Sequence, residues 1–517
     1  MAGDADKGST TSTGSTKDEV TIGFPGIPSG FDPFTVSGHG SFVPLLYSTL
    51  VALDKDVNVV PDLATGYSVS DDALTYTFTL RTDAVFSDGE PVKVSDAVFT
   101  FEKIMSGASE IDLAVVDSVF ESDGQLVIKL KRPRSTFILD VAGIGIAPEH
   151  AYGEDFSLHP IGSGPYVLEQ YDVGQQMILM ANNLYYGAAP AIKRAVFVNM
   201  TDEDQQLIAV KSGQVDITLT SATIAAANTV PGYRLVVEET VDNMGITMPV
   251  IPAGSMASDS GNPMGNDVTC DIAVRKAVAY AIDRERLCRE ALNGYGTPAY
   301  SENDGMPWWN PESVIETDVA FARELLDSSG WVDADGDGIR EKNGQKASFP
   351  VYYFAGDSAR QALAMSAANQ VLENIGVEMV VQGAGEGDMV AMMVAWPVVL
   401  AWGSSNPITS YYLFHSASIG RDDWYDPESF GDAAVDAYLD AALGANSMEE
   451  AIPYWQKAQW DGTTGTSMRG ECPYIFLANK DHLYYAREGL DIGDQMIHAH
   501  GAGWTLVANL KEWRWEN

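Results

Sequence analysis

From residue 19 onward, short apolar runs are separated by Gly, Pro and Asp, and many of these runs have the length and alternation of β-strands. Clean alternation of apolar and polar residues is typical of a half-buried strand, and a short continuous apolar run is typical of a buried one. The pattern predicts strands at residues 20–24, 74–81, 125–130, 177–182, 192–200 and 379–382.

Between these strands, apolar residues recur every three to four positions, which predicts amphipathic helices. One helix follows the turn at Gly89, with Ser95 as its N-cap. Alternating strands and helices imply sheets covered by helices, an α/β architecture. The other helices are predicted at residues 202–213, 271–291, 318–328, 358–374, 432–444 and 447–460.

At 517 residues the chain is longer than one hydrophobic core usually supports, so two or more lobes are expected. Residues 3–17 are rich in Ser, Thr and Gly, which predicts a flexible tether over residues 1–17. No run of about 18 apolar residues is present that would span a bilayer. Cys288 lies in a helical pattern and is expected to pack as a small apolar residue.

The charge balance is strongly acidic: 72 Asp and Glu face 31 Lys and Arg, a formal charge of −41. A surface of this sign repels phosphate backbones and argues against nucleic-acid binding. It fits an extracellular or salt-adapted surface, or cationic ligands. The glycine-rich segments 162–165 and 383–387 lack the residues of a nucleophile elbow or a phosphate loop, so no catalytic residues are assigned.

The segment SDGEPVKVSDAVFTFEKI, residues 87–104, resembles the signature of the family 5 solute-binding proteins, the peptide- and nickel-binding receptors of ABC importers. Further strings resemble other blocks of this family and follow one another in the family's order. These strings cover residues 45–81, 161–187, 210–217, 270–287 and 330–344.

The resemblance implies a class II periplasmic-binding-protein fold, in which two lobes joined by a hinge close around a ligand. Lobe one, the larger, is then discontinuous and comprises residues 18–245 and 478–517, while lobe two comprises residues 246–477. The chain is expected to cross between the lobes near residues 244–247 and again near residues 474–477.

The same resemblance places the segment AWGSSNP, residues 401–407, on the ligand cleft, with Trp402 and Gly403 in the family's tryptophan-glycine position. A tryptophan offers a broad, rigid contact surface there, although a core role is the alternative. Peptide-binding members usually place an aspartate next, which pairs with the ligand's amine. This chain has Ser404, Ser405 and Asn406 instead, so pairing of that kind needs an acidic residue from elsewhere.

Only seven histidines occur, so their positions are informative. His415 follows the Trp402 segment, and with His39 it forms a candidate pair that completes the coordination of a metal chelate across the cleft. The alternative is that the two histidines are unrelated. His498 and His500 form a second candidate pair, for which a surface loop is expected. The family's ligand-facing loop corresponds to His39, Gly40 and Ser41.

One acidic loop matches the first nine positions of a calcium-binding loop. Position 12 is Gly344 rather than the bidentate Glu, so a solvated turn is the competing interpretation. The metal candidates are Asp333, Asp335, Asp337 and Glu341, with Gly338 at the turn.

The resulting functional hypothesis is a receptor without catalysis that delivers a peptide or peptide-like solute to an ABC permease. The alternatives are a nickel-chelate receptor, a cell-surface sensor that does not transport, and an acidic hydrolase, for which no nucleophile–base pair is evident. We expect a monomer outside the cytoplasm, held at the membrane by a lipid anchor or by the permease. No cofactor is assigned beyond calcium at the Asp333 loop.

Overall fold

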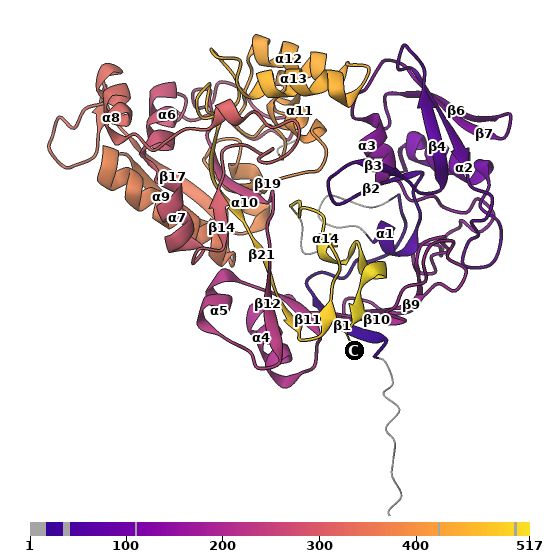
Figure 1. The fold of residues 1–517 in the computed structure, drawn as a ribbon. Helices are drawn as coiled ribbons and strands as arrows, with labels where there is room; N and C mark the ends of the chain where they lie inside the picture. Colours follow the sequence, from indigo (N-terminus) through magenta and orange to yellow (C-terminus); the bar gives the residue numbers. More distant parts are fainter. Residues whose placement is uncertain (1–16, 35–41, 109–110, 422–423, 501–503, 517) are drawn as a thin grey trace, which may run out of the picture.

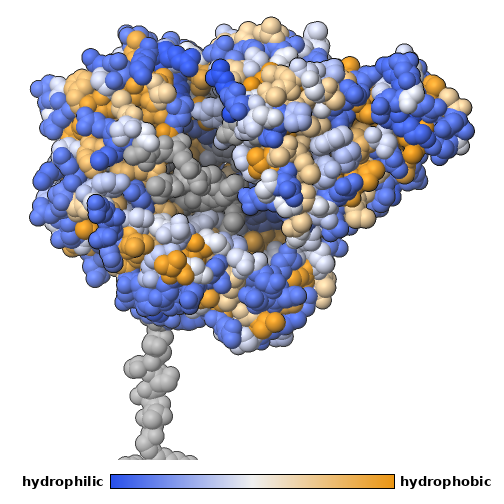
Figure 2. Space-filling view, turned by 180° about the vertical axis from the view of Figure 1, so that it is seen from behind, coloured by the Kyte–Doolittle hydropathy of each residue, from blue (hydrophilic) through white to orange (hydrophobic). Residues whose placement is uncertain are grey.

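The computed structural model describes residues 17–34, 42–108, 111–421, 424–500 and 504–516. The predicted tether lies outside the described residues except for Lys17, whose Nζ contacts Asp216 Oδ1 at 2.7 Å. Polar residues cover most of the face seen in Figure 2, as the acidic composition implies. Within the described ranges, no helix is both long and apolar enough to pass through a bilayer.

Lobe one is built on a seven-stranded mixed sheet of order β12-β21-β11-β1-β10-β9-β8 (Figure 1). The central strand β1 (Glu19–Phe24) pairs in parallel with β10 and β11, and the other pairs are antiparallel. The remaining strands are β8 (Tyr166–Asp172), β9 (Gln176–Ala181), β10 (Arg194–Asn199), β11 (Ile217–Thr220), β12 (Tyr233–Glu238) and β21 (His482–Arg487).

A second sheet of lobe one, of order β4-β5-β7-β6, is entirely antiparallel and shares a hydrophobic core with the first. Its strands are β4 (Ala64–Val69), β5 (Thr75–Leu80), β6 (Val116–Ser122) and β7 (Gln125–Leu130), with the pair β2 (Val51–Leu53) and β3 (Val59–Pro61) nearby. The helices of lobe one are α1 (Val43–Leu46), α2 (Val94–Lys103), α3 (Phe137–Ala142), α4 (Glu203–Ser212), α5 (Ala222–Ala227) and α14 (Trp504–Val507).

Lobe two has its own core, built on the sheet β14-β20-β13-β19 and the parallel pair β17-β18. Its strands are β13 (Asn243–Thr247), β14 (Gly296–Pro298), β17 (Ser348–Phe354), β18 (Glu378–Ala384), β19 (Val399–Trp402) and β20 (Tyr474–Lys480). Its helices are α6 (Ile272–Ala281), α7 (Arg284–Ala291), α8 (Val319–Ser328), α9 (Ser358–Ile375), α10 (Glu386–Met392), α11 (Ile408–Phe414), α12 (Ala433–Leu443) and α13 (Met448–Gln459).

Two helix predictions were wrong in detail, and in both an aspartate is responsible. Helix α2 begins at Val94 rather than after Ser95, because the buried Asp96 carboxylate accepts the Lys93 amide at 2.8 Å. The single helix predicted at residues 271–291 is two helices, since Asp283 caps α7 by accepting the Arg286 amide at 2.8 Å. The positive φ predicted for Gly89 is confirmed at 94°, and Cys288 is buried as expected.

The chain passes from lobe one to lobe two between β12 and β13, through residues 239–242, and returns between β20 and β21 at Asp481. The predicted crossings at residues 244–247 and 474–477 fall inside β13 and β20. The chain therefore changes sheet just before β13 and just after β20. The lobe limits at residues 245 and 478 stay predictions.

Both crossings meet at the buried carboxylate of Asp242, which also contacts a third segment of the chain. His482 Nε2 lies 3.0 Å from Asp242 Oδ2, His500 Nδ1 lies 2.6 Å from Oδ1, and Lys480 Nζ lies 3.6 Å from Oδ2. His498 is fully buried behind His482, with their Nδ1 atoms 3.1 Å apart. The expectation of a surface loop for His498 and His500 was therefore wrong, because their segment packs against the crossing strands.

Burial shapes the ionisation of this hinge cluster. Burial opposes the charge on Asp242, but the neighbouring charges of His500 and Lys480 and the hydrogen bonds from both histidines hold its pKa well below its usual range. Burial, and then the charge of His482, lowers the pKa of His498 from 6.5 to about 3. His498 therefore stays neutral in the folded protein at any pH near neutrality.

This depressed pKa predicts a specific loss of stability in acid. Between pH 6.5 and about 3 the unfolded chain protonates His498 and the folded chain does not. Stability from this group is therefore lost as the pH falls, by about 1.4 kcal/mol per pH unit. We expect His498→Gln to flatten the pH dependence of the unfolding free energy, measured in urea at about pH 7 and about pH 5.

The groups that face His498 are His482, Tyr484 and Gln495, and they are kept in this comparison. The exposed His159 supplies the control, since His159→Gln should leave the pH dependence unchanged. If the unfolding free energy of His498→Gln changes with pH as steeply as that of the unmodified chain, the lowered pKa of His498 is not the cause of the pH dependence.

Candidate ligand-binding site between the lobes

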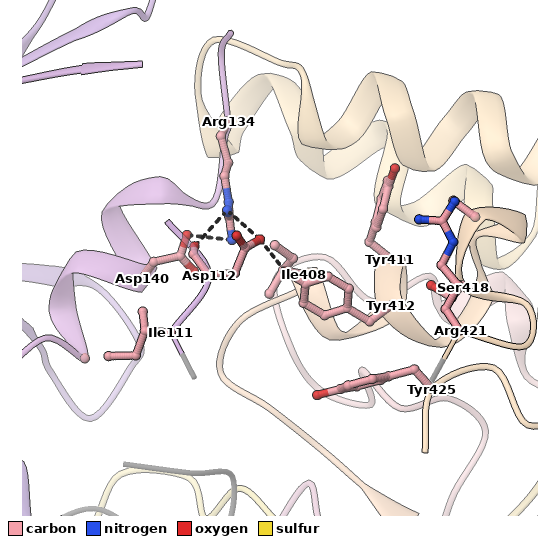
Figure 3. Close-up of a pocket in the computed structure, with 12 residues that line it drawn as sticks. Ile111, Asp112, Arg134, Asp140, Ile408, Tyr411, Tyr412, Ser418, Arg421 and Tyr425 are labelled. Carbon is pink, nitrogen blue, oxygen red and sulfur yellow. Dashed lines mark hydrogen bonds and ion pairs between the residues drawn. The ribbon is translucent and has the colours of Figure 1, made fainter. Parts of the chain in front are cut away.

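A cavity of about 660 Å³ lies where helix α3 of lobe one faces helix α11 of lobe two (Figure 3). The residues that line it come from both lobes, so its shape depends on how the lobes are placed. Lobe one contributes Ile111, Asp112, Arg134, Asp140 and Gly143, and lobe two contributes Ile408, Tyr411, Tyr412, Ala417, Ser418, Arg421 and Tyr425.

The side of the cavity in lobe one is organised by the buried guanidinium of Arg134. Its Nη2 lies 3.0 Å from Asp140 Oδ2, and its Nη1 lies 3.4 Å from Asp112 Oδ2. Figure 3 shows Arg134 between these two carboxylates, with Asp140 on helix α3. The short loop between β7 and α3 carries Arg134 into this position, because the chain turns there through Pro133.

Two hydrogen bonds join these carboxylates to lobe two. Asn406 Nδ2 donates to Asp140 Oδ1 at 2.8 Å, and the Tyr412 hydroxyl donates to Asp112 Oδ2 at 3.1 Å. Nearby, Ser135 donates from its amide to the Leu443 carbonyl at 2.8 Å. The lobes are therefore linked by polar contacts at the cavity as well as by the chain crossings.

The buried position of Asp140 alters its ionisation. Burial raises the pKa of Asp140 to about 6, although Arg134 and the hydrogen bond from Asn406 favour its charged form. The carboxylate is thus mostly charged at neutral pH and becomes protonated in mild acid. A contact between the lobes consequently depends on a group that titrates near pH 6.

Trp402 ends strand β19 and lies behind the cavity wall. Its ring stacks on Tyr425 with centroids 6.0 Å apart, and its Nε1 is buried with no hydrogen-bond partner in the described part of the chain. Gly403 has φ 137°, and a Cβ there would lie 1.8 Å from the Val241 carbonyl oxygen. Glycine is thus required where this segment passes Val241 in the first crossing between the lobes. Ser404 Oγ accepts the Asn406 amide at 3.1 Å.

His415 lies beside the cavity rather than in its wall. Its Nδ1 accepts the Ala417 amide at 3.0 Å and so caps a short 3₁₀ turn, while its Nε2 is 3.4 Å from Asp440 Oδ1. The ring stacks on Tyr411 at 4.4 Å. The predicted partner loop, His39, Gly40 and Ser41, lies outside the described residues. Joint coordination by His39 and His415 stays a prediction.

The Asp333 loop forms a compact turn at the surface. Ligand atoms of Asp333, Asp335 and Glu341 lie within 4.8 Å of one another, whereas Asp337 pairs with Lys346. The Asp333 carboxylate accepts the amides of Gly336 at 2.7 Å and Gly338 at 3.0 Å. These hydrogen bonds within the loop stabilise the turn. Calcium binding there stays a prediction.

Sequence reasoning missed most of the cavity. The segment KRPRST, residues 131–136, has the pattern of a break after a strand, but it supplies Arg134. The segment YYLFHSAS, residues 411–418, is a candidate by sequence only through His415, although its paired tyrosines form the wall. The adjacent tyrosines were the signal available, since exposed aromatic pairs are common at binding surfaces.

A cavity between two lobes joined by crossing strands defines a two-lobed ligand-binding protein. A model of the family described as "Bacterial extracellular solute-binding proteins, family 5 Middle" matches residues 58–430. The chain therefore belongs to family 5 of the bacterial extracellular solute-binding proteins, as its signature segment predicts.

Three relatives illustrate the similarity. Protein XP55 of Streptomyces lividans is 30% identical over 492 residues, covering 92% of this chain and 86% of that protein. The oligopeptide-binding protein AppA of Bacillus subtilis is 26% identical over 430 residues, covering 78% and 77%. The structure of NikZ from Campylobacter jejuni in complex with Ni(L-His) has a TM-score of 0.81 and 23% identity, covering 96% and 99%. The last confirms the predicted fold.

The contact between Asn406 and Asp140 leads to a prediction about lobe closure. Asn406→Asp removes the amide donor and sets a second carboxylate against Asp140, which should weaken the observed arrangement by about 1–3 kcal/mol. We expect a larger radius of gyration in solution X-ray scattering. The difference should shrink at about pH 5, where a protonated carboxyl donates again.

The matched control is Asn58→Asp, because Asn58 donates to Asp54 at 3.3 Å within one exposed loop of lobe one. That variant should leave the radius of gyration unchanged. An unchanged radius in Asn406→Asp as well would show that this hydrogen bond does not hold the lobes together.

Proposed function

We propose that this protein captures a peptide or peptide-like small solute in the cavity between its lobes and delivers it to the permease of an ABC importer. The observation that carries the proposal is the cavity itself, whose wall is divided between the two lobes. A ligand that contacts both lobes favours their closure, and closure is a change that a permease can recognise. Membership of family 5 and the similarity to the oligopeptide-binding protein AppA support this function.

The chemistry of the cavity suits such a solute. Its volume of about 660 Å³ lies in the range of about 300–1,000 Å³ that is usual for small-molecule sites. Tyr411, Tyr412 and Tyr425 offer rigid apolar faces, and charged groups lie at its edges. This combination of apolar walls with a few charged groups matches a short peptide better than a sugar or a bare ion.

The remaining parts of the proposal follow from this role. The protein acts outside the cytoplasm as a monomer, attached to the membrane through a lipid anchor or through the permease subunits. It binds its solute without catalysis. Family membership supports the extracytoplasmic location, and the acidic composition suits a solvated surface.

Peptide binding should stabilise the protein against heat. A pool of short peptides at 100 times its Kd should add about 2.7 kcal/mol to the stability of the folded state, which a thermal melt detects. Tyr425→Ala should abolish the shift, because it removes one aromatic wall of the cavity. Tyr454→Ala is the matched control, because Tyr454 lies on helix α13 outside the cavity lining. This variant should keep the thermal shift. A flat response of the unmodified protein to the pool would refute peptide capture.

A nickel chelate is the second candidate, favoured by the likeness to NikZ and by His415 beside the cavity. If a nickel–histidine chelate binds, His415→Ala should weaken that binding by about tenfold or more, since one coordinate bond or its support is lost. Calorimetry with the chelate measures the loss. Equal affinity in the variant and the unmodified protein would remove this candidate.

A further inference from the structure

Two charged side chains occupy opposite ends of the cavity. Asp112 of lobe one has 49% of its side chain exposed, and Arg421 of lobe two is exposed as well. Figure 3 shows them on opposite sides of Tyr411 and Tyr412. The cavity is therefore polar at both ends, with opposite signs on the two lobes.

The residues of lobe one that line the cavity carry a net negative charge. Asp112 and Asp140 share the single guanidinium of Arg134, so two acids and one base leave one negative charge. The closer pair is Arg134 with Asp140, at 3.0 Å against 3.4 Å for Asp112. Asp112 Oδ2 accepts the Tyr412 hydroxyl at 3.1 Å and Oδ1 accepts the Ala114 amide at 2.9 Å, while about half of the side chain stays exposed to the cavity. The charge available to a ligand thus lies on Asp112.

The end in lobe two carries a positive charge. The backbone amide of Arg421 donates to the Ser418 carbonyl at 3.1 Å, which fixes the start of its loop. Its guanidinium makes no ion pair or hydrogen bond with the residues that the structure describes. Asp422 and Asp423 follow it in the chain and lie outside the described residues. Arg421 thus presents its donors at the cavity, and a guanidinium matches a carboxylate in geometry.

The wall between the two charges is apolar. Ile408 and the ring of Tyr412 lie between them in Figure 3, and Tyr425 forms the neighbouring side. Tyr425 is backed by Trp402, so this side is a layer of two stacked rings. Such a wall accepts apolar or aromatic side chains and offers little to a strongly hydrated polar body.

We propose that the cavity selects a zwitterionic solute, with its cationic group at Asp112 and its anionic group at Arg421. This inference rests on the proposed function and names the chemical class of its ligand. Ser404, Ser405 and Asn406 follow Gly403 in place of the aspartate that the family resemblance leads one to expect, and Asn406 is already engaged with Asp140. The carboxylate for the ligand's amine comes instead from the opposite lobe.

This arrangement gives each lobe one of the two charge contacts. A zwitterion neutralises both ends only when the lobes are together, so its binding favours closure. A solute that lacks one charge leaves either Asp112 or Arg421 desolvated and unpaired, which is unfavourable. Specificity thus follows from rejecting solutes with one charge as well as from attracting those with two.

The test uses the full chain and three probes: a pool of free di- and tripeptides, the same pool N-acetylated, and the same pool C-amidated. Calorimetry should show the free pool binding at least about tenfold more tightly than either blocked pool. Arg421→Gln should lose affinity for the free pool and bind the amidated pool about as well. Asp112→Asn keeps an oxygen for the Tyr412 hydroxyl. This variant should lose affinity for the free pool and bind the acetylated pool about as well as the unmodified chain does.

Two control variants remove a charge from an exposed position away from the cavity: Arg289→Gln on helix α7 and Asp117→Asn on strand β6. Both should bind the three pools with the affinities of the unmodified chain. If the free pool binds but Arg421→Gln weakens the free and amidated pools equally, the charge assignment is wrong while peptide capture stands. Equal weakening of the free and acetylated pools by Asp112→Asn would likewise overturn the charge assignment alone. If no pool binds the unmodified protein, peptide capture and the zwitterion assignment both fail.

Discussion

The arrangement of this molecule depends on one buried carboxylate, that of Asp242. It lies in the first crossing, just before β13, and it contacts Lys480 at the end of β20 and His482 at the start of β21. His500 contacts it from a third segment. A charge removed from water is stable only with close partners, so these segments are held in one register. The amide of His500 also donates to the carbonyl of Gly403, which places the Trp402 segment beside the hinge.

The cavity follows from this placement of the lobes. Arg134 and its two acids approach from lobe one, and the tyrosines of α11 and Tyr425 approach from lobe two. Each lobe contributes one wall, so the volume of the cavity depends on both. Hinge and cavity are therefore mechanically related: Gly403 packs against Val241 of the first crossing, and one residue earlier Trp402 supports the cavity through Tyr425.

The fold was largely predictable, and its local errors have a common cause. Alternation and apolar spacing located the longer helices and the strands β1, β5, β7, β9, β10 and β18, because burial of one face imposes these periods on the chain. Strands such as β6 and β21 were not predicted. Start and break points were misplaced where a single aspartate accepts a backbone amide: Asp96 rather than Ser95 sets the start of α2, and Asp283 divides the predicted helix at residues 271–291. Several aspartates and serines compete for each such role, and only the folded backbone selects one.

The amino-acid sequence by itself determined the family, the two-lobed α/β architecture and the acidic surface, because these depend on composition, periodicity and local motifs. The tertiary structure decided which side chains meet. Asp140 and Asn406 are 266 positions apart, and Asp242 and His500 are 258 apart, yet each pair is in hydrogen-bond contact. No local pattern encodes such distant pairs, since they form only when two separately packed cores are brought together at the crossing strands.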